Sequence, residues 1–206
     1  MQPFDRHPVI PILIVENPEE AVRAVGAIVE GGLDVIEITL RKANALAVLE
    51  ACVKAFPHAV IGAGMVQRPS EVTAAKSAGA RFLTSPGLTA GLAAAGIASG
   101  LPFMPGAATA SEVMVARDMS FPFLKFFPAF EAGGVPLLRS FAAAFAGIEF
   151  CPAGGIDEEM AAEYLAQPNV PVVGATWIAK AEAIDQGDWR GITDRARRAV
   201  AFKRVA

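Results

Sequence analysis

The sequence contains few of the side chains that build disulfide frameworks or metal sites. Its 206 residues include two cysteines, Cys52 and Cys151, and two histidines, His7 and His58. The cysteines lie far apart in apolar segments without CxxC spacing, which argues against a disulfide framework and a thiolate zinc site. The histidines precede the expected first and third strands, at the wrong end for catalysis, so the sequence predicts no metal site.

The sequence also lacks an excess of positive charge and a long uninterrupted apolar segment. Its formal net charge is −3 at pH 7, whereas domains that bind nucleic acid are usually basic. Residues 82–110 carry no charge, but prolines and glycines interrupt them, and a membrane-spanning helix needs about 20 continuous apolar residues. Residues 1–8 contain no apolar core of a signal peptide. We therefore expect a cytoplasmic protein without a nucleic-acid or membrane partner.

Apolar side chains, by contrast, are abundant. Hydrophobic residues make up 53% of the chain and charged residues 19%, which is too apolar for a disordered protein. A length of 206 residues is typical of one domain. We expect residues 1–206 to form a single domain.

Short β-rich apolar runs recur along the chain at intervals of 21 to 26 residues. They end near Val15, Leu40, Gly62, Thr84, Pro105, Phe126, Pro152 and Gly174. Helical segments with start signals separate them, such as Asn17-Pro18 and the capping box of Thr109 and Glu112. This alternation predicts a parallel sheet with right-handed crossovers.

Eight strand–helix units are the number that closes a (β/α)8 TIM barrel. We expect the barrel to span about residues 8–180 and a C-terminal helix to follow over about residues 188–204. The alternative is an open doubly wound sheet, which normally carries a glycine-rich phosphate fingerprint after its first strand. Residues 15–18 contain no glycine, so the sequence favours the barrel.

Charged residues inside apolar strands mark the expected active site, because catalysis in such barrels occurs at the carboxyl ends of the strands. The second strand reads Val35-Ile36-Glu37-Ile38-Thr39-Leu40-Arg41. Its period of two sends Glu37, Thr39 and Arg41 into the barrel mouth. The alternative interpretation is a structural ion pair that closes a layer of the barrel.

Lys125 lies in the expected sixth strand, with two large apolar residues on each side. Burying an ammonium is costly and favours the neutral amine, which can attack a carbonyl to form a Schiff base. The alternative is a Lys125–Glu37 salt bridge without chemistry.

Two glycine-containing loops suit a phosphate group. Ala153-Gly154-Gly155 follows the seventh strand and Gly174-Ala175-Thr176 follows the eighth, the usual phosphate site of this fold. A plain tight turn is the alternative for each.

Several segments together resemble the KDPG/KHG aldolases, which are bacterial class I aldolases. The likeness runs from about Pro8 to Asp188. The matching segments are Glu37-Ile38-Thr39-Leu40-Arg41, Gly62-Ala63-Gly64, Ser85-Pro86-Gly87-Leu88, Lys125-Phe126-Phe127-Pro128-Ala129, and Cys151-Pro152 with Gly154-Gly155-Ile156.

The resemblance implies a barrel assembled as a homotrimer that needs no cofactor. It implies Lys125 as the Schiff-base lysine, Glu37 as the proton-shuttling acid and base, and Arg41 as the partner of the substrate carboxylate. The substrate-binding residues expected with them are Thr39, Arg41, Met65, Pro86, Phe127, Gly154, Gly155, Gly174 and Thr176.

The expected reaction is cleavage of 2-dehydro-3-deoxy-6-phosphogluconate to pyruvate and glyceraldehyde 3-phosphate. Most family members carry threonine where this chain has Met65, and many carry threonine at Ala153. These departures leave open the same chemistry on 4-hydroxy-2-oxoglutarate, the galactonate epimer or another 2-keto acid. A non-catalytic anion-binding barrel and a phosphate-binding isomerase are the alternatives outside aldolase chemistry.

Overall fold

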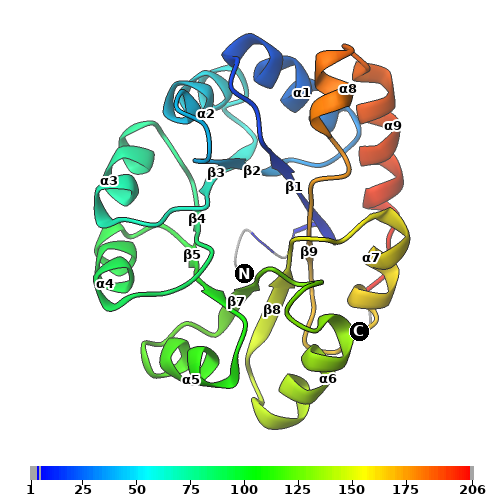
Figure 1. The fold of residues 1–206 in the computed structure, drawn as a ribbon. Coiled ribbons are helices and arrows are strands. Elements are labelled where there is room, and N and C mark those ends of the chain that lie inside the picture. The colour runs from blue at the N-terminus through cyan, green and yellow to red at the C-terminus, as the bar shows by residue number, and fades with distance from the viewer. Residues whose placement is uncertain (1–3, 5, 205–206) are drawn as a thin grey trace.

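The computed structural model describes residue 4 and residues 6–204, in which strands and helices alternate (Figure 1). The strands are β1 (Val9–Leu13), β2 (Val35–Thr39), β3 (Val60–Gly64), β4 (Leu83–Thr84), β5 (Phe103–Met104), β6 (Gly106–Ala107), β7 (Phe123–Phe126), β8 (Glu149–Pro152) and β9 (Val173–Ala175). The helices are α1 (Pro18–Glu30), α2 (Ala45–Ala55), α3 (Pro69–Ser77), α4 (Ala90–Ser99), α5 (Ala110–Asp118), α6 (Gly134–Ala144), α7 (Glu158–Leu165), α8 (Ala181–Asp185) and α9 (Trp189–Val200). Within these residues, no helix is long and apolar enough to cross a membrane.

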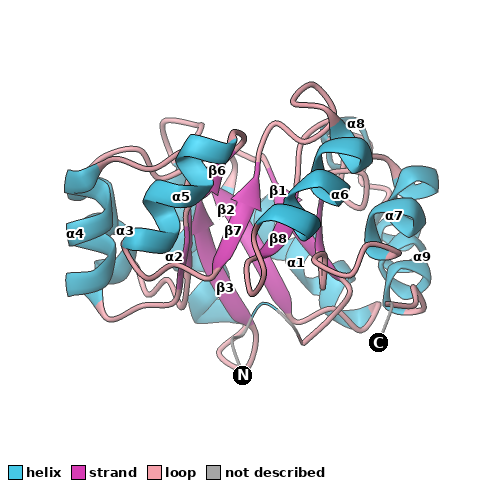
Figure 2. Cartoon of the chain, turned by 90° about the horizontal axis from the view of Figure 1, so that it is seen from below, coloured by secondary structure: helices cyan, strands magenta, loops and turns pink. Residues whose placement is uncertain are grey.

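The strands form a curled parallel sheet with the helices on its outside (Figures 1 and 2). Six strands pair in the order β5-β4-β3-β2-β1-β9, and β6-β7-β8 form a second, three-stranded ladder. Each expected apolar run ends at or close to an observed strand. The predicted strand–helix alternation is thus confirmed, and the pairing of β1 with β9 brings the two ends of the chain's strand series together.

The expected fifth strand differs from the prediction because Pro105 divides it into β5 and β6. Proline has no backbone N–H to donate to a ladder. Its carbonyl still accepts a hydrogen bond from the Lys125 amide at 2.9 Å. The two halves therefore pair with different neighbours, β5 with β4 and β6 with β7.

Two apolar clusters hold the sheet. The larger one lies between the strands and the helices and includes Ile36 and Ile38 of β2. The smaller one consists mostly of residues at or just before the start of a strand; its members are Phe4, Ile10, Val35, Phe82, Met104, Phe123, Cys151 and Val172. The Phe4 ring packs edge-on against Phe82 and stacks on Phe123, with centroid distances of 5.2 and 5.5 Å.

The helix start signals read from the sequence are confirmed. Asn17 caps α1 and accepts a hydrogen bond from the Glu19 amide, with Pro18 as the first helical residue. Thr109 and Glu112 form the capping box of α5. Each cap satisfies amides that lack a partner within the helix.

An ion pair joins the start of α7 to the end of α9. The Glu158 carboxylate accepts hydrogen bonds from Nε and Nη2 of Arg198 at 2.6 and 2.9 Å. The hydrogen bond from Arg198 lowers the pKa of Glu158 below its ordinary value, against a smaller opposing effect of burial. A carboxyl whose pKa is lowered by folding stabilises the protein above its unfolded pKa and loses that contribution as the pH falls through its folded pKa.

We therefore expect Glu158→Gln to lower the free energy of unfolding by about 0.5 kcal/mol at pH 7, since the pair is partly exposed. The difference from wild type should vanish near pH 2, where both states bind the proton. Urea unfolding at several pH values measures this. Glu159→Gln removes a neighbouring charge in the same first turn, so an equal loss in both variants would contradict a specific role for the ion pair.

Candidate active site

A buried ion pair crosses the interior of the curled sheet. Lys125 of β7 and Glu37 of β2 are each only 2% exposed. The Lys125 Nζ donates to Oε1 and Oε2 of Glu37 at 2.8 and 3.0 Å and to Oγ1 of Thr84 at 3.2 Å. Three acceptors thus satisfy the three N–H groups of the ammonium, which offsets part of the cost of removing both charges from water.

Glycine on the neighbouring strand leaves room for the Glu37 carboxylate. Gly64 ends β3, which pairs with β2, and a Cβ at this position would overlap the carboxylate. On the other side of the site, a Cβ on Gly106 would overlap the Pro86 backbone. The backbone at these two glycines therefore approaches its neighbours more closely than any other residue would allow.

Thr84 is the contact that sequence reasoning missed. It ends β4, is fully buried and holds the third acceptor for Lys125. The available signal was a hydroxyl residue closing the apolar run of Phe82 and Leu83, directly before the segment with Ser85 and Pro86.

The expected second strand is shorter than predicted: β2 ends at Thr39, so it contains Glu37 and Thr39 but not Arg41. Thr39 is buried, and its hydroxyl donates to the Leu13 carbonyl at 3.1 Å, so it joins β2 to β1. Arg41 lies beyond the end of β2 and is exposed. No side chain in residues 4 and 6–204 pairs with its guanidinium.

Three further expected residues lie on loops that follow strands. Met65 comes directly after β3, is nearly buried and has a left-handed backbone with φ of 59°. Pro86 follows β4, and Phe127 follows β7 with its ring centroid 5.8 Å from the Lys125 Nζ. Of these three residues, Phe127 is the one with a recorded contact to Lys125.

The expected phosphate loops lie at the same, carboxyl edge of the sheet. Gly154 and Gly155 have φ values of 95° and 71°, a conformation that glycine adopts without strain. Gly174 lies in β9, where a Cβ would contact Ala153 and Ile12 at 2.8 Å. The turn after β8 therefore packs close to β9.

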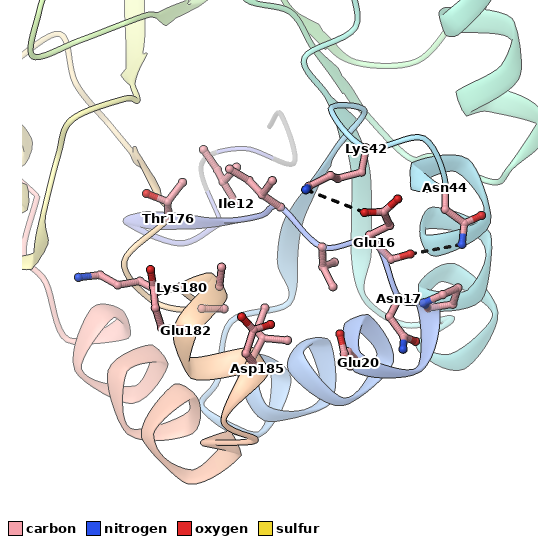
Figure 3. A pocket seen from close by; sticks show the side chains of 16 residues that line it. Ile12, Glu16, Asn17, Glu20, Lys42, Asn44, Thr176, Lys180, Glu182 and Asp185 are labelled. Atoms are coloured by element: carbon pink, nitrogen blue, oxygen red, sulfur yellow. Dashed lines mark hydrogen bonds and ion pairs between the residues drawn. The ribbon is translucent and has the colours of Figure 1, made fainter.

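Thr176 opens onto a cavity of about 1000 Å³ at this edge, between α1 and α8 (Figure 3). Lys42 points across it toward Glu16, at 3.9 Å, and the Asn44 amide donates to the Glu16 carbonyl at 3.3 Å. Neither Lys125 nor Glu37 lines this cavity, and Thr176 is the one expected site residue that does. The cavity is therefore separate from the buried ion pair.

Cys151 of β8 pairs in register with Lys125. Burial raises the pKa of its thiol to about 12; the charge of Lys125 lowers this pKa by a smaller amount, and the charge of Glu37 raises it further. The thiol is therefore neutral at physiological pH, and the Glu37 carboxylate is the anionic partner of the lysine.

The fold and the site together define a class of protein. It is a parallel α/β protein whose strands hold a buried lysine against one carboxylate and one hydroxyl. These are the groups that covalent catalysis through an amine requires, with an acid–base partner in contact.

The sequence model of the family described as "Aldolase: KDPG and KHG aldolase" matches residues 2–195. The chain belongs to this family, and the resemblance seen in its motifs is confirmed. It is 41% identical over 199 residues to the 2-dehydro-3-deoxy-phosphogluconate aldolase of Zymomonas mobilis, covering 97% of this chain and 94% of the relative. It is 40% identical over 193 residues to the KHG/KDPG aldolase of Escherichia coli, covering 94% and 91% of the two chains.

Solved structures agree with this assignment. The KDPG aldolase of Legionella pneumophila, crystallised with pyruvate captured at low pH as a covalent carbinolamine intermediate, superimposes with a TM-score of 0.94 at 40% identity, over 96% of each chain. The 2-keto-3-deoxy-6-phosphogluconate aldolase of Zymomonas mobilis with 3-phosphoglycerate gives a TM-score of 0.92 at 40% identity, over 98% of this chain and 95% of that one.

The space at Gly64 leads to a prediction about the ion pair. Gly64→Ala should displace the Glu37 carboxylate and leave the Lys125 ammonium poorly paired, which destabilises the fold by about 3 kcal/mol. Gly91→Ala is the control, because a Cβ in that first turn of α4 meets no atom closer than 3.9 Å. Urea unfolding compares them, and equal stabilities would show that Glu37 does not depend on this space.

Proposed function

We propose that this protein is a class I aldolase that cleaves 2-dehydro-3-deoxy-6-phosphogluconate into pyruvate and glyceraldehyde 3-phosphate, with Lys125 as the Schiff-base nucleophile. The observation that supports this most is the buried contact of the Lys125 Nζ with the Glu37 carboxylate at 2.8 Å, in a chain of this family. The carboxylate in direct contact can accept a proton from the ammonium and so free the nitrogen lone pair for attack on a carbonyl.

Lys125 and Glu37 together can carry out every proton transfer that Schiff-base formation requires. Glu37 takes one proton from the ammonium, and the neutral Nζ attacks the C2 ketone. The nitrogen lone pair forms the N–C2 bond, the C=O π pair moves to oxygen, and one proton passes from nitrogen to that oxygen. The protonated Glu37 then protonates the resulting hydroxyl, which leaves as water, so that a protonated iminium and a carboxylate remain.

Cleavage uses the same carboxylate again. Glu37 removes the C4 hydroxyl proton, the C3–C4 bond breaks, and its electron pair moves into the iminium to give an enamine and the aldehyde. The protonated Glu37 then returns a proton to C3, and water hydrolyses the iminium to release pyruvate. One carboxylate thus serves as base and acid in turn.

We assign the binding of the substrate ends to residues at the carboxyl edge of the sheet. Arg41 offers an exposed guanidinium without a side-chain partner among the described residues, which suits a planar carboxylate. Thr39, Met65, Pro86 and Phe127 line the pyruvyl end in this assignment. The phosphate would meet the backbone of Gly154, Gly155 and Gly174 and the hydroxyl of Thr176.

We also infer that residues 1–206 form one domain in which the two ladders together make a (β/α)8 barrel, over about residues 8–180, followed by the C-terminal helix. The adjacency of β8 and β9 supports closure on one side. The close approach of β5 and β6 on either side of Pro105 supports it on the other.

A homotrimer is the assembly that we propose, following the resemblance to the family. Its support within the chain is the exposure of large apolar side chains on adjacent helices. Ile97 of α4 is 61% exposed, and Met114 and Val115 of α5 are 46% and 47% exposed. Burial of such residues between subunits would remove apolar surface from water.

A second candidate is the same chemistry on an unphosphorylated 2-keto acid such as 4-hydroxy-2-oxoglutarate. Ala153 provides no hydroxyl in the proposed phosphate loop. Acidic side chains outnumber lysines around the cavity onto which Thr176 opens; the charged lining residues are Glu16, Glu20, Lys42, Lys180, Glu182 and Asp185. That balance is unfavourable for a dianion nearby.

Borohydride reduction in the presence of pyruvate tests the mechanism. We expect one pyruvyl adduct per chain, located on Lys125 by peptide mass spectrometry, and none in Lys125→Ala, which should also lose all measurable cleavage. Lys54→Ala removes an exposed lysine of α2 and is the control. Cleavage close to that of wild type in Lys125→Ala would refute the Schiff-base proposal.

Substrate pairs test the phosphate assignment. Thr176→Ala should lower kcat/KM for the 6-phosphorylated substrate about tenfold, because a hydrogen bond to a charged group is lost. The same variant should leave kcat/KM for 4-hydroxy-2-oxoglutarate unchanged, which serves as the internal control. Equal effects on both substrates, or equal turnover of both by wild type, would favour the second candidate.

A further inference from the structure

Among the described residues, all buried serine and threonine hydroxyls except one donate a hydrogen bond to a backbone carbonyl. Five serine and threonine residues are buried: Thr39, Thr84, Ser85, Ser99 and Thr193. Four of them donate to backbone carbonyls, namely those of Leu13, Gly87, Gly96 and Ala27, at 2.6 to 3.1 Å. Thr84 is the exception.

Thr84 Oγ1 contacts the Lys125 Nζ at 3.2 Å, and in this contact the ammonium donates. No oxygen or nitrogen among residues 4 and 6–204 accepts the Thr84 hydroxyl proton. Burying a hydroxyl whose donor has no partner is unfavourable. A fully buried donor beside the reactive nitrogen therefore remains available to a bound molecule.

The hydroxyls of Ser85 and Thr39 cannot donate to a bound molecule in the same way, because each already donates to a backbone carbonyl. Ser85 donates to the Gly87 carbonyl at 2.6 Å and accepts from the Gly106 amide at 3.4 Å. Thr39 donates to Leu13 on the adjacent strand. Both stabilise the backbone, whereas Thr84 contacts the lysine alone.

The chemistry of Schiff-base formation creates the missing acceptor. When Nζ attacks C2, the former ketone oxygen stays bonded to C2 and thus lies one atom away from the nitrogen. A hydroxyl within hydrogen-bond distance of Nζ is then close enough to donate to that oxygen. Negative charge grows on this oxygen during attack, and a donor at this place stabilises the charge.

We propose that Thr84 is a further catalytic residue of this site, which holds the Lys125 Nζ and donates a hydrogen bond to the C2 oxygen as the carbinolamine forms. Thr84 keeps its own proton throughout, and the proton transfers remain those of Lys125 and Glu37 described above. This inference rests on the proposed Schiff-base function of Lys125.

The rate of adduct formation tests the proposal. The enzyme is mixed with pyruvate, quenched into borohydride at successive times, and the reduced adduct is measured by intact-protein mass spectrometry. Thr84→Val and Thr84→Ala remove the hydroxyl, and Thr84→Ser keeps it. Thr193→Val removes a buried hydroxyl in α9, remote from the site, and controls for the loss of a hydroxyl from the interior.

We expect Thr84→Val and Thr84→Ala to form the adduct about tenfold more slowly than wild type, the effect of one hydrogen bond to developing charge. Their final occupancy should still reach one adduct per chain. Thr84→Ser and Thr193→Val should react within about twofold of wild type. In steady state, kcat should fall with the adduct rate in the two variants that lack the hydroxyl, while KM changes little.

Three results would overturn the proposal. The first is an adduct rate in Thr84→Val equal to that of wild type. The second is an equal slowing in Thr84→Ser and Thr84→Ala, which would assign a packing role to the threonine methyl. The third is a final adduct occupancy well below one per chain in Thr84→Val and Thr84→Ala, because the apparent slowing would then reflect incomplete reaction and not a lower rate. If Thr84→Val fails to fold, the adduct rates of Thr84→Ser and Thr84→Ala are sufficient to test the role of the hydroxyl. If the wild-type protein itself forms no adduct, the proposed Schiff-base function of Lys125 is refuted. This result differs from the three above, which refute only the role of Thr84.

Discussion

The buried ion pair of Lys125 and Glu37 is the constraint on which the rest of the site depends. Removing two charges from water costs several kcal/mol per ion, and the attraction between them recovers this only with good geometry and further hydrogen bonds. Both residues are 2% exposed. The strands that meet at this point must therefore supply space and hydrogen-bond partners, and each of them carries a residue suited to that requirement.

The neighbours of the pair show how the requirement is met. Gly64 leaves the space that the Glu37 carboxylate occupies. Thr84 supplies the third acceptor to the ammonium. Cys151, with its pKa raised by burial, adds a neutral side chain next to Lys125. The pair keeps its charge complementarity because, within residues 4 and 6–204, Glu37 is the one carboxylate in contact with the Lys125 ammonium.

The apolar cluster at the amino ends of the strands complements this arrangement. Side chains such as Val35, Phe82 and Phe123, at or just before the start of their strands, fill the interior there. Polar and glycine residues collect at the opposite, carboxyl ends, where the loops and the cavity beside Thr176 lie. Stability and reactivity are thus assigned to opposite ends of the same strands, as is general for proteins of this architecture.

The sequence by itself determined the alternation of strands and helices, because hydrophobic periodicity, caps and turn residues act over a few neighbouring positions. It also singled out Lys125 and Glu37 as candidate site residues, because a charged residue inside an apolar strand is rare. The division of the fifth strand at Pro105, the position of Arg41 beyond β2 and the role of Thr84 were not foreseen. Lys125 is 88 residues from Glu37 and 41 from Thr84, and only the curling and register of the sheet decided that these three side chains meet, because contacts over such separations depend on how all the intervening strands pack.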